Sequence, residues 1–548
     1  VFCDVAGFQH LVLSELIDVL GRVYAGSIGF EFMHIQSAEE RRWLKERIED
    51  RFDDRGHVLT DETCKRVLGH LIVAETFEEE LHKRFVGQKR FGLQGAETIM
   101  SMLYSIITKG ADLGVAEAVI GMAHRGRLNV LANIIGKPLE DILSEFQDLS
   151  ISSMVGAGDV KYHLGYSGKS TNSNGKSTVV SLAPNPSHLE FVNPVVEGIV
   201  RAKQDFEYGH ARDKVAPILI HGDAAFIGQG VVWETLNLSG VDAYATGGTV
   251  HLIINNQVGF TTYPDESRST PYCTDIAMAV QAPVFHINSE DVEAACWASQ
   301  VALEYRQRFG RDVVLDLYCY RKYGHNEADE PSFTQPVMYQ EIKAKRKLST
   351  IYAEKLCREG VMTEDEVAAI AREYAAGMDS AQKSRPEASA EVCDTLGRIR
   401  GRVDSTGVEH ATLERITQTM LEFPEDFTPH PKLVAIFKRR ADALAQGKGI
   451  DWGYAEALAL GSLLLERVPV RLTGQDSRRG TFGHRHLGID DHKTGERYTP
   501  FSVLAEEGQT QLALYNSTLS EAAVVGFEFG FSCEAQQGLV MWEAQFGD

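Results

Sequence analysis

Hydrophobic residues in the first part of the chain recur at the spacing of α-helices. Phe77, Leu81 and Phe85 follow one another at every fourth residue, which places them on one face of a helix. The segment 38–51 is strongly charged but also carries apolar residues at helical spacing. We therefore predict a helical N-terminal region over residues 1–95.

A different pattern runs from residue 96 to residue 335. Short apolar runs alternate with glycine-rich loops and amphipathic stretches, which is typical of an α/β fold with a parallel sheet flanked by helices. In such sheets ligands bind beyond the carboxyl ends of the strands, so the loops that follow these runs are expected to carry the chemistry. The predicted strands are Ala118–Met122, Pro217–His221, Thr249–Ile254, Val284–Ile287 and Val313–Tyr320.

The chain then returns to helix and polar linker before a second α/β pattern begins. Thr363 and Glu366 have the spacing of a capping box, which predicts that a helix starts there. Further along, a strand, a helix and a strand are predicted at Val468–Thr473, Ser520–Phe531 and Gly538–Trp542. The predicted parts are the helical N-terminal region (1–95), an α/β domain (96–335), a helical linker (336–450) and the start of a second, incomplete α/β domain (451–548).

The composition is that of an acidic globular protein. Of the 548 residues, 43% are hydrophobic and 24% are charged, and 77 acidic against 55 basic side chains give a net charge of −22. Such a chain is not expected to bind nucleic acid or a membrane surface through its bulk charge. No apolar run approaches the roughly 20 residues of a membrane-spanning helix. The eight cysteines form no CxxC pair and suit a reducing compartment.

Two predicted strands end in polar residues that could hold a metal ion. One strand is followed by Gly222 and Asp223, and the next by Asn255 and Asn256, a separation that suits one strand–helix–strand crossover. Carboxylate and amide oxygens are ligands that Mg²⁺ accepts, with backbone, water and diphosphate oxygens to complete the set. Each half alone is ambiguous, because a strand-end Asp can cap a helix and an Asn pair can form a turn. The two halves in this order favour a metal site.

The order of these motifs resembles the thiamine diphosphate fingerprint, a Gly-Asp pair followed by a double Asn. Further segments extend the resemblance over nearly the whole chain. Together they are similar to the thiamine-dependent first component of the 2-oxoglutarate dehydrogenase complex, which implies a thiamine diphosphate-binding fold. These segments are Met122–Asn129, Gly158–Gly165, Asn185–Glu190, Gly324–Glu327, Gly480–His486 and Trp542–Asp548.

The resemblance implies roles for particular residues of this chain. The implied metal ligands are Asp223, Asn256 and the backbone oxygen of Val258. The implied cofactor-binding residues are Arg125, Leu189, Asp223, Ala224, Ala225, Asn256 and His325. The implied substrate-binding residues are His124, His163 and Ser187. The implied catalytic residues are Glu521, which would bond N1′ of the aminopyrimidine, together with His124, His163 and His325.

Each of these residues also has an ordinary structural interpretation. A single histidine is most often held in place by hydrogen bonds, and Glu521 could simply be a glutamate favoured by the dipole at a helix start. Matching motifs on several separate strand-end loops favour the functional interpretation for the histidines. The physical chemistry agrees, because histidine and serine are suitable donors to the carboxylates of a dianionic 2-oxo acid.

The resemblance also implies a reaction and its partners. The reaction is the oxidative decarboxylation of 2-oxoglutarate in the tricarboxylic acid cycle, with thiamine diphosphate and Mg²⁺ as cofactors. The succinyl group would pass to the lipoyl group of a partner dihydrolipoyl succinyltransferase, which works with dihydrolipoyl dehydrogenase. A homodimer is expected, in the cytoplasm of a bacterium or in the mitochondrial matrix of a eukaryote.

Three other functions stay open at this stage. A paralogue acting on 2-oxoadipate differs in its substrate by one methylene, worth only about 1–3 kcal/mol of selectivity. A related 2-oxoglutarate decarboxylase or carboligase would use the same site, and a scaffold subunit would dock without turnover.

The family continues beyond both ends of this sequence, so we expect the chain to be truncated. Two residues, Gln94 and Ser27, depart from those usual in the family. The segment Gly228-Gln229-Gly230 resembles a dinucleotide-binding loop but lacks its third glycine, so we do not expect a nicotinamide dehydrogenase of the Rossmann kind.

Overall fold

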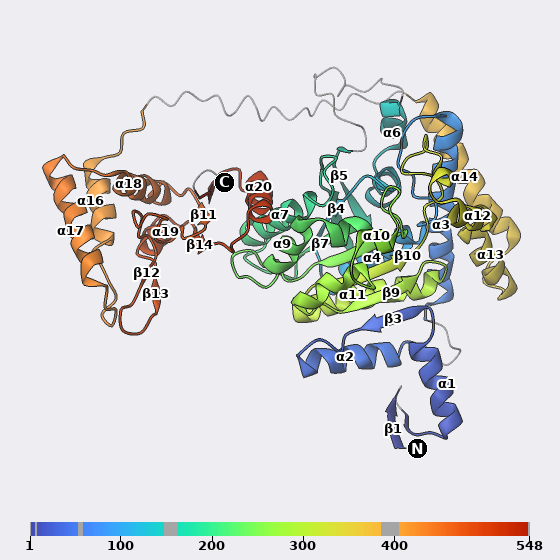
Figure 1. Ribbon diagram of the computed structural model, residues 1–548. Helices are drawn as coiled ribbons and strands as arrows, with labels where there is room; N and C mark the ends of the chain where they lie inside the picture. Colours follow the sequence, from blue (N-terminus) through green and yellow to red (C-terminus); the bar gives the residue numbers. More distant parts are fainter. Residues whose placement is uncertain (1, 6–7, 53–57, 147–162, 385–404, 546–548) are drawn as a thin grey trace. The chain divides into compact units, whose positions relative to one another are not determined.

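The chain forms two compact units, residues 1–388 and 389–548 (Figure 1). No described helix is long and apolar enough to cross a membrane. The computed structural model describes residues 2–5, 8–52, 58–146, 163–384 and 405–545.

An eight-stranded sheet forms the centre of the first unit. Its inner strands are parallel, and an antiparallel strand closes each edge. The strands predicted from the apolar runs are confirmed as β4, β7, β8, β9 and β10, whereas β3, β5 and β6 were not predicted. The order across the sheet is β3 (Ile28–Glu31), β9 (Val284–Asn288), β10 (Val313–Tyr318), β8 (Val250–Asn255), β7 (Val215–Gly222), β4 (Glu117–Met122), β6 (Ser177–Leu182) and β5 (Tyr166–Thr171).

Helices cover both faces of this sheet because successive strand residues point to opposite sides. On β4, Ala118 and Ile120 belong to the main core cluster, whereas Val119 packs with residues of α7 (Val192–Phe206). The main core lies between the sheet and α4 (Thr98–Leu113).

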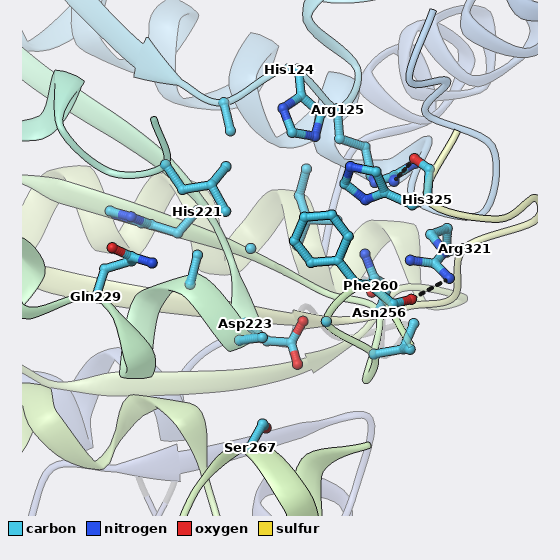
Figure 2. Close-up of a pocket in the computed structure, with 18 of the residues that line it drawn as sticks. His124, Arg125, His221, Asp223, Gln229, Asn256, Phe260, Ser267, Arg321 and His325 are labelled. Atoms are coloured by element: carbon cyan, nitrogen blue, oxygen red, sulfur yellow. Dashed lines mark hydrogen bonds between the residues drawn. The ribbon is translucent and has the colours of Figure 1, made fainter. Parts of the chain in front are cut away.

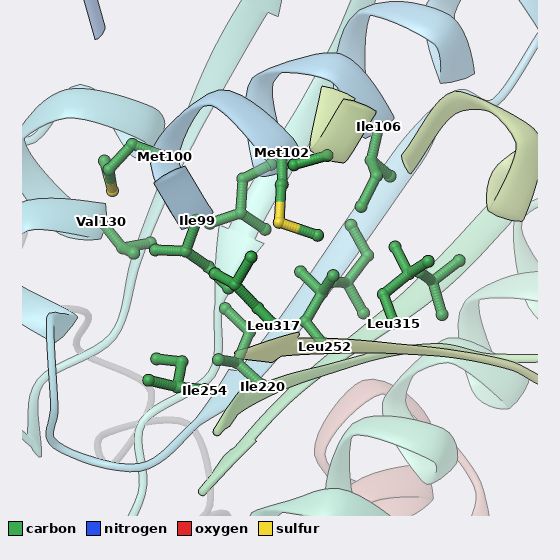
Figure 3. Packing of buried hydrophobic residues seen from close by; sticks show 14 of the residues in the cluster. Ile99, Met100, Met102, Ile106, Val130, Ile220, Leu252, Ile254, Leu315 and Leu317 are labelled. Carbon is green, nitrogen blue, oxygen red and sulfur yellow. The ribbon is translucent and has the colours of Figure 1, made fainter. Parts of the chain in front are cut away.

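Figure 3 shows this core at close range. Ile99 and Ile106 of α4 share a fully apolar cluster with Leu252 of β8 and Leu315 of β10, and all four side chains are buried. Burial of one such side chain contributes about 1.5–3 kcal/mol. The packed core therefore fixes the strands whose carboxyl ends carry the polar loops.

Further helices surround the sheet, and their starts are set by capping side chains. Thr60 accepts a hydrogen bond from the Thr63 amide at the start of α3, and Thr363 with Glu366 forms the predicted capping box at the start of α14. α14 packs against α3, so residues 336–384 of the predicted linker fold within the first unit. These helices are α1 (Leu13–Tyr24), α2 (Ala38–Glu49), α3 (Asp61–Arg84), α6 (Leu139–Phe146), α9 (Gly230–Leu238), α11 (Val292–Phe309), α12 (Pro336–Ala344), α13 (Leu348–Arg358) and α14 (Glu364–Lys383).

Short elements complete the first unit. They are the hairpin of β1 (Phe2–Val5) and β2 (Phe8–His10), the helices α5 (Arg127–Val130), α8 (Asp223–Gly228) and α10 (Pro264–Ser267), the π-helix Leu131–Ile135, and the 3-10 helices Cys273–Val280 and Pro331–Phe333.

The second unit is a smaller α/β structure. Its parallel sheet has the order β14 (Leu512–Asn516), β11 (Val470–Gly474), β15 (Leu539–Glu543). The predicted strands at β11 and β15 and the predicted helix at α20 are confirmed, and β14 was not predicted. The other elements are α16 (His410–Thr419), α17 (Pro431–Gln446), α18 (Trp452–Leu465), α19 (Ser502–Glu507), α20 (Ala522–Glu534) and the hairpin of β12 (Ile489–Asp490) and β13 (Arg497–Tyr498).

Candidate active site

A pocket of about 280 Å³ opens beyond the carboxyl ends of β4, β7 and β8 (Figure 2). This is the position at which parallel α/β sheets bind ligands. The structure brings all the implied cofactor-binding residues to this one pocket, although they come from loops far apart in the sequence. These residues are Arg125, Leu189, Asp223, Ala224, Ala225, Asn256 and His325, and His124 and Val258 line the pocket with them.

One side of the pocket offers oxygen ligands for a cation. Asp223 directly follows β7 and Asn256 directly follows β8, and these two strands are parallel neighbours. The Asp223 carboxyl is buried, and burial raises its pKa to about 6 although Arg268, 3.8 Å away, opposes the rise. The amide oxygen Oδ1 of Asn256 is buried and has no hydrogen-bond partner in the described part of the chain.

These two groups fit a magnesium diphosphate. A buried amide oxygen left without a partner is costly, and a hard cation beside the Asp223 carboxylate would satisfy it. Val258 lines the same pocket. The described residues contain no group of three or more histidine, cysteine or acidic side chains able to hold a metal, so a cation here would need oxygens from its ligand or from water.

A cluster of aromatic rings lines the opposite side. The rings of His124 and His325 lie 5.4 Å apart between centroids. Phe260 stacks on His325 at 4.1 Å, and Phe91 packs on His124 at 4.2 Å. Burial, with the positive charge of Arg125 next, lowers the pKa of His124 to about 3 and that of His325 to about 4. Both imidazoles are therefore neutral at pH 7, when each carries one donor and one acceptor nitrogen.

Arg125 ties two loops of the pocket together. Its Nη1 donates to the carbonyl of Gly92 at 3.1 Å, and its Nη2 donates to the carbonyl of His325 at 2.9 Å (Figure 2). Burial lowers the pKa of Arg125 to about 10, which leaves it cationic at neutral pH. The side chain thus brings positive charge to the pocket while its donors hold the backbone.

His163 and Ser187 form a pair outside the pocket lining. The Ser187 hydroxyl and His163 Nε2 lie 3.1 Å apart, within hydrogen-bond distance. His163 is nevertheless close enough to His124 to contribute to lowering its pKa. Of the predicted segment Gly158–Gly165, positions 158–162 lie outside the described residues.

Glu521 belongs to the second unit, and the pocket belongs to the first. It precedes α20 as the N-cap residue, as the helix-start interpretation requires. Its carboxylate accepts a hydrogen bond from Gln475 Nε2 at 3.0 Å. The residue is exposed, so its carboxylate remains open to a ligand.

Several pocket residues were not identified from the sequence, among them Arg321, Gln229 and Phe260. Arg321 follows β10 and donates from Nη2 to the carbonyl of Phe260 at 3.0 Å. Its position after a buried strand was a usable signal, since the strand-end rule applies to it as to Asp223. Gln229, within the rejected Gly-Gln-Gly segment, and Phe260, with φ of 54°, also line the pocket, but no residue pattern marks them.

The fold is a parallel α/β sheet with a ligand-sized pocket beyond the carboxyl ends of its strands. Residues 70–392 match the family model of the dehydrogenase E1 component, and residues 448–548 match the transketolase pyrimidine-binding domain. The chain belongs to the dehydrogenase E1 component family.

Individual relatives agree with this family assignment. The chain is 44% identical to the 2-oxoglutarate dehydrogenase E1 components of Brucella melitensis, Brucella canis and Brucella abortus, over alignments of 571 residues that include all of this chain. Each alignment covers 56% of the relative. The chain therefore spans about half the length of the curated relatives it matches.

Proposed function

We propose that the protein to which this chain belongs is a thiamine diphosphate-dependent enzyme that decarboxylates 2-oxoglutarate. The two matched families use thiamine diphosphate, usually with Mg²⁺. The names of the similar Brucella proteins support 2-oxoglutarate as the substrate. In this proposal the succinyl group passes to a lipoylated dihydrolipoyl succinyltransferase, and dihydrolipoyl dehydrogenase reoxidises the lipoyl group.

The observation that carries the proposal is the pair of oxygen ligands at the ends of β7 and β8. The carboxylate of Asp223, the unbonded Oδ1 of Asn256 and the carbonyl of Val258 would hold Mg²⁺ and through it a diphosphate. When bound, thiamine diphosphate supplies a nucleophilic carbon and an electron sink for the decarboxylation. Glu521 would hold a proton at N1′ of the cofactor's aminopyrimidine ring.

The residues of the first unit would bind and orient the substrate. His124 and His325 are neutral near pH 7, so each can donate one hydrogen bond to a carboxylate or move one proton. The bonded pair of His163 and Ser187 would add donors beside them. The ring of Phe260 stacks on His325 at 4.1 Å and would help to hold its imidazole in place.

Calorimetric titration with thiamine diphosphate and Mg²⁺ tests the proposal. Wild-type protein should bind the cofactor, and Asp223→Asn should weaken binding at least tenfold because it removes the only charge of the proposed ligand set. Asp265→Asn, an exposed acid on α10 outside the pocket lining, is the matched control and should bind like the wild type. Equal affinity of Asp223→Asn and wild type, both folded by circular dichroism, would contradict the proposed metal site.

Substrate preference is tested next on the same protein. With cofactor present, 2-oxoglutarate should be decarboxylated in preference to 2-oxoadipate. A clear preference for 2-oxoadipate would make the chain part of the paralogue. Cofactor binding without turnover of either acid in the folded full-length protein would favour the scaffold.

A further inference from the structure

A second cavity of about 350 Å³ lies in the first unit, between the end of α1, the residues after α2 and the start of α11. None of its lining residues lines the candidate active site. Polar and aromatic side chains face it together. Those used in the argument below are Arg22, Arg51, Phe52, Asp291, Glu293 and Lys355.

The unusual group in this cavity is the guanidinium of Arg51. The residue is only 9% exposed, and its Nη2 donates to the carbonyl of Arg22 at 3.0 Å. Its Nη1 is buried and has no hydrogen-bond partner among the described residues. No described carboxylate forms an ion pair with it, and three rings surround it instead.

The rings hold the guanidinium in place. Its Cζ lies 4.6 Å from the ring of Phe52, 5.4 Å from Phe30 and 5.6 Å from Trp297. Burial lowers the pKa of Arg51 to about 10, with Asp291 opposing the change, so it stays cationic at neutral pH. A buried charge that lacks a counter-ion is costly to the fold, and cation–π contacts offset only about 0.5–2 kcal/mol of that cost.

The acids of the cavity are already bound elsewhere. Asp291 accepts the hydroxyl of Ser27 and the amide of Ala294, which makes it the cap of α11. Glu293 accepts the hydroxyl of Tyr352 at 3.1 Å and pairs with Lys355.

A second arginine adds to the positive charge. Arg22, in the last turn of α1, packs on Phe52 at 5.5 Å and has no ion pair with any described residue. Lys355 pairs with Glu293, so the cations of the cavity that have no ion pair with a described residue are the two arginines. This arrangement calls for an anion from outside the unit.

We propose that this cavity is a binding site for a small organic anion. A carboxylate or phosphate group would sit on Arg51 Nη1 and on Arg22, and the apolar part of the ligand would contact Ile28, Val58 and the neighbouring rings. Carboxylate and phosphate share the chemistry that the arginines recognise. The site stands on its own contacts and does not depend on the proposed function.

Calorimetric titration of the purified protein with phenyl phosphate and, separately, with benzoate tests the site. At least one probe should bind saturably, and Arg51→Gln, which keeps a polar side chain but removes the charge, should weaken that binding at least tenfold. Arg47→Gln, a change on the neighbouring helix α2 at a residue paired with Glu304, is the matched control and should bind like wild type. The probe that binds identifies the anionic group.

A second variant protects the test against misfolding. If Arg51→Gln does not fold, Arg22→Gln, at an exposed position, should still weaken binding several-fold. The proposal is wrong if neither probe binds wild type saturably, or if the folded Arg51 and Arg22 variants bind as tightly as Arg47→Gln. Binding that is equally lost in Asp223→Asn would place the probe in the active-site pocket and also overturn it.

Discussion

The neutral histidines of the pocket make the stability of the protein depend on pH. In the unfolded chain a histidine has a pKa of about 6.5, whereas the folded pKa values are about 3 for His124 and about 4 for His325. The unfolded state therefore binds protons first as the pH falls. Stability contributed by these two residues is present above pH 6.5 and is lost below it.

Urea unfolding at pH 7 and pH 5 measures this effect. Over this range we expect the free energy of unfolding to fall by about 2 kcal/mol through His124, and by about 1 kcal/mol through His325, whose greater exposure to solvent weakens the effect. His124→Gln and His325→Gln should each remove that share of the pH dependence. His410→Gln, a change at an exposed residue of the second unit, should leave it intact. If the pH dependence of the free energy of unfolding is the same in both pocket variants as in the wild type, these histidines take up protons as readily in the folded protein as in the unfolded chain.

At the residue scale, the sequence predicts which residues lie near the site better than it predicts which partners their side chains bond. Asp223 and Asn256 could be placed at one edge because parallel strands end at the same side of a sheet. The donors of Arg125 could not be assigned, because their targets are carbonyls of Gly92 and His325, brought close only by the tertiary fold. The pairing of His163 with Ser187 is likewise a product of packing.

Among the structural segments, the loop that precedes α4 is held by the carboxylates of Glu78, Glu97 and Glu327, and Glu327 accepts from three successive amides. Glu327 accepts backbone hydrogen bonds from Arg90, Phe91 and Gly92, at 2.8, 3.3 and 2.7 Å. Phe91 has φ of 51°, a conformation unfavourable for a residue other than glycine. Glu327 therefore stabilises a strained loop whose phenylalanine ring packs on the pocket histidines.

Glu327→Gln tests this role. Its amide can accept at one atom only and presents N–H groups to the other donors, so we expect about 2 kcal/mol of lost stability and weaker cofactor binding. The matched control is Glu330→Gln, three residues further along the chain, where the exposed carboxylate accepts from Ser332 and from no other described residue. The expected change is within about 0.5 kcal/mol. Equal effects of the two variants on unfolding and on cofactor affinity would show that Glu327 does not hold the loop.

Among the secondary-structure elements, the buried strands could be predicted from the hydrophobic pattern of the sequence, whereas the edge strands could not. β7, β8 and β10 are apolar over almost their whole length because both faces are covered by helices. β5, with the sequence YSGKST, has largely exposed side chains, so hydrophobic patterning gives no signal for it. β3 is only four residues long and owes its place to pairing with β9.

For the whole molecule, the proposed function draws on residues of both units. The implied cofactor residues lie in unit 1–388, and Glu521 lies in unit 389–548. From the resemblance to E1 components we expect a homodimer, and we propose that Glu521 of one subunit completes the site of the other. The sequence could suggest this division of labour through its two α/β patterns, but the spacing of residues along one chain does not distinguish a site within a subunit from one between subunits.

Complementation between two inactive variants separates these arrangements. Asp223→Asn and Glu521→Gln should each be inactive as homodimers of the full-length protein. In a heterodimer, sites shared between subunits leave one site with both Asp223 and Glu521 intact, so about half of the wild-type activity should return. Sites built within one subunit would each keep one defect, and the heterodimer would stay inactive. Differently tagged subunits, co-expressed and purified through both tags, supply the heterodimer, and a doubly tagged wild type sets the full rate. Recovery of activity would thus locate Glu521 across the subunit boundary, because no other arrangement restores an intact pair.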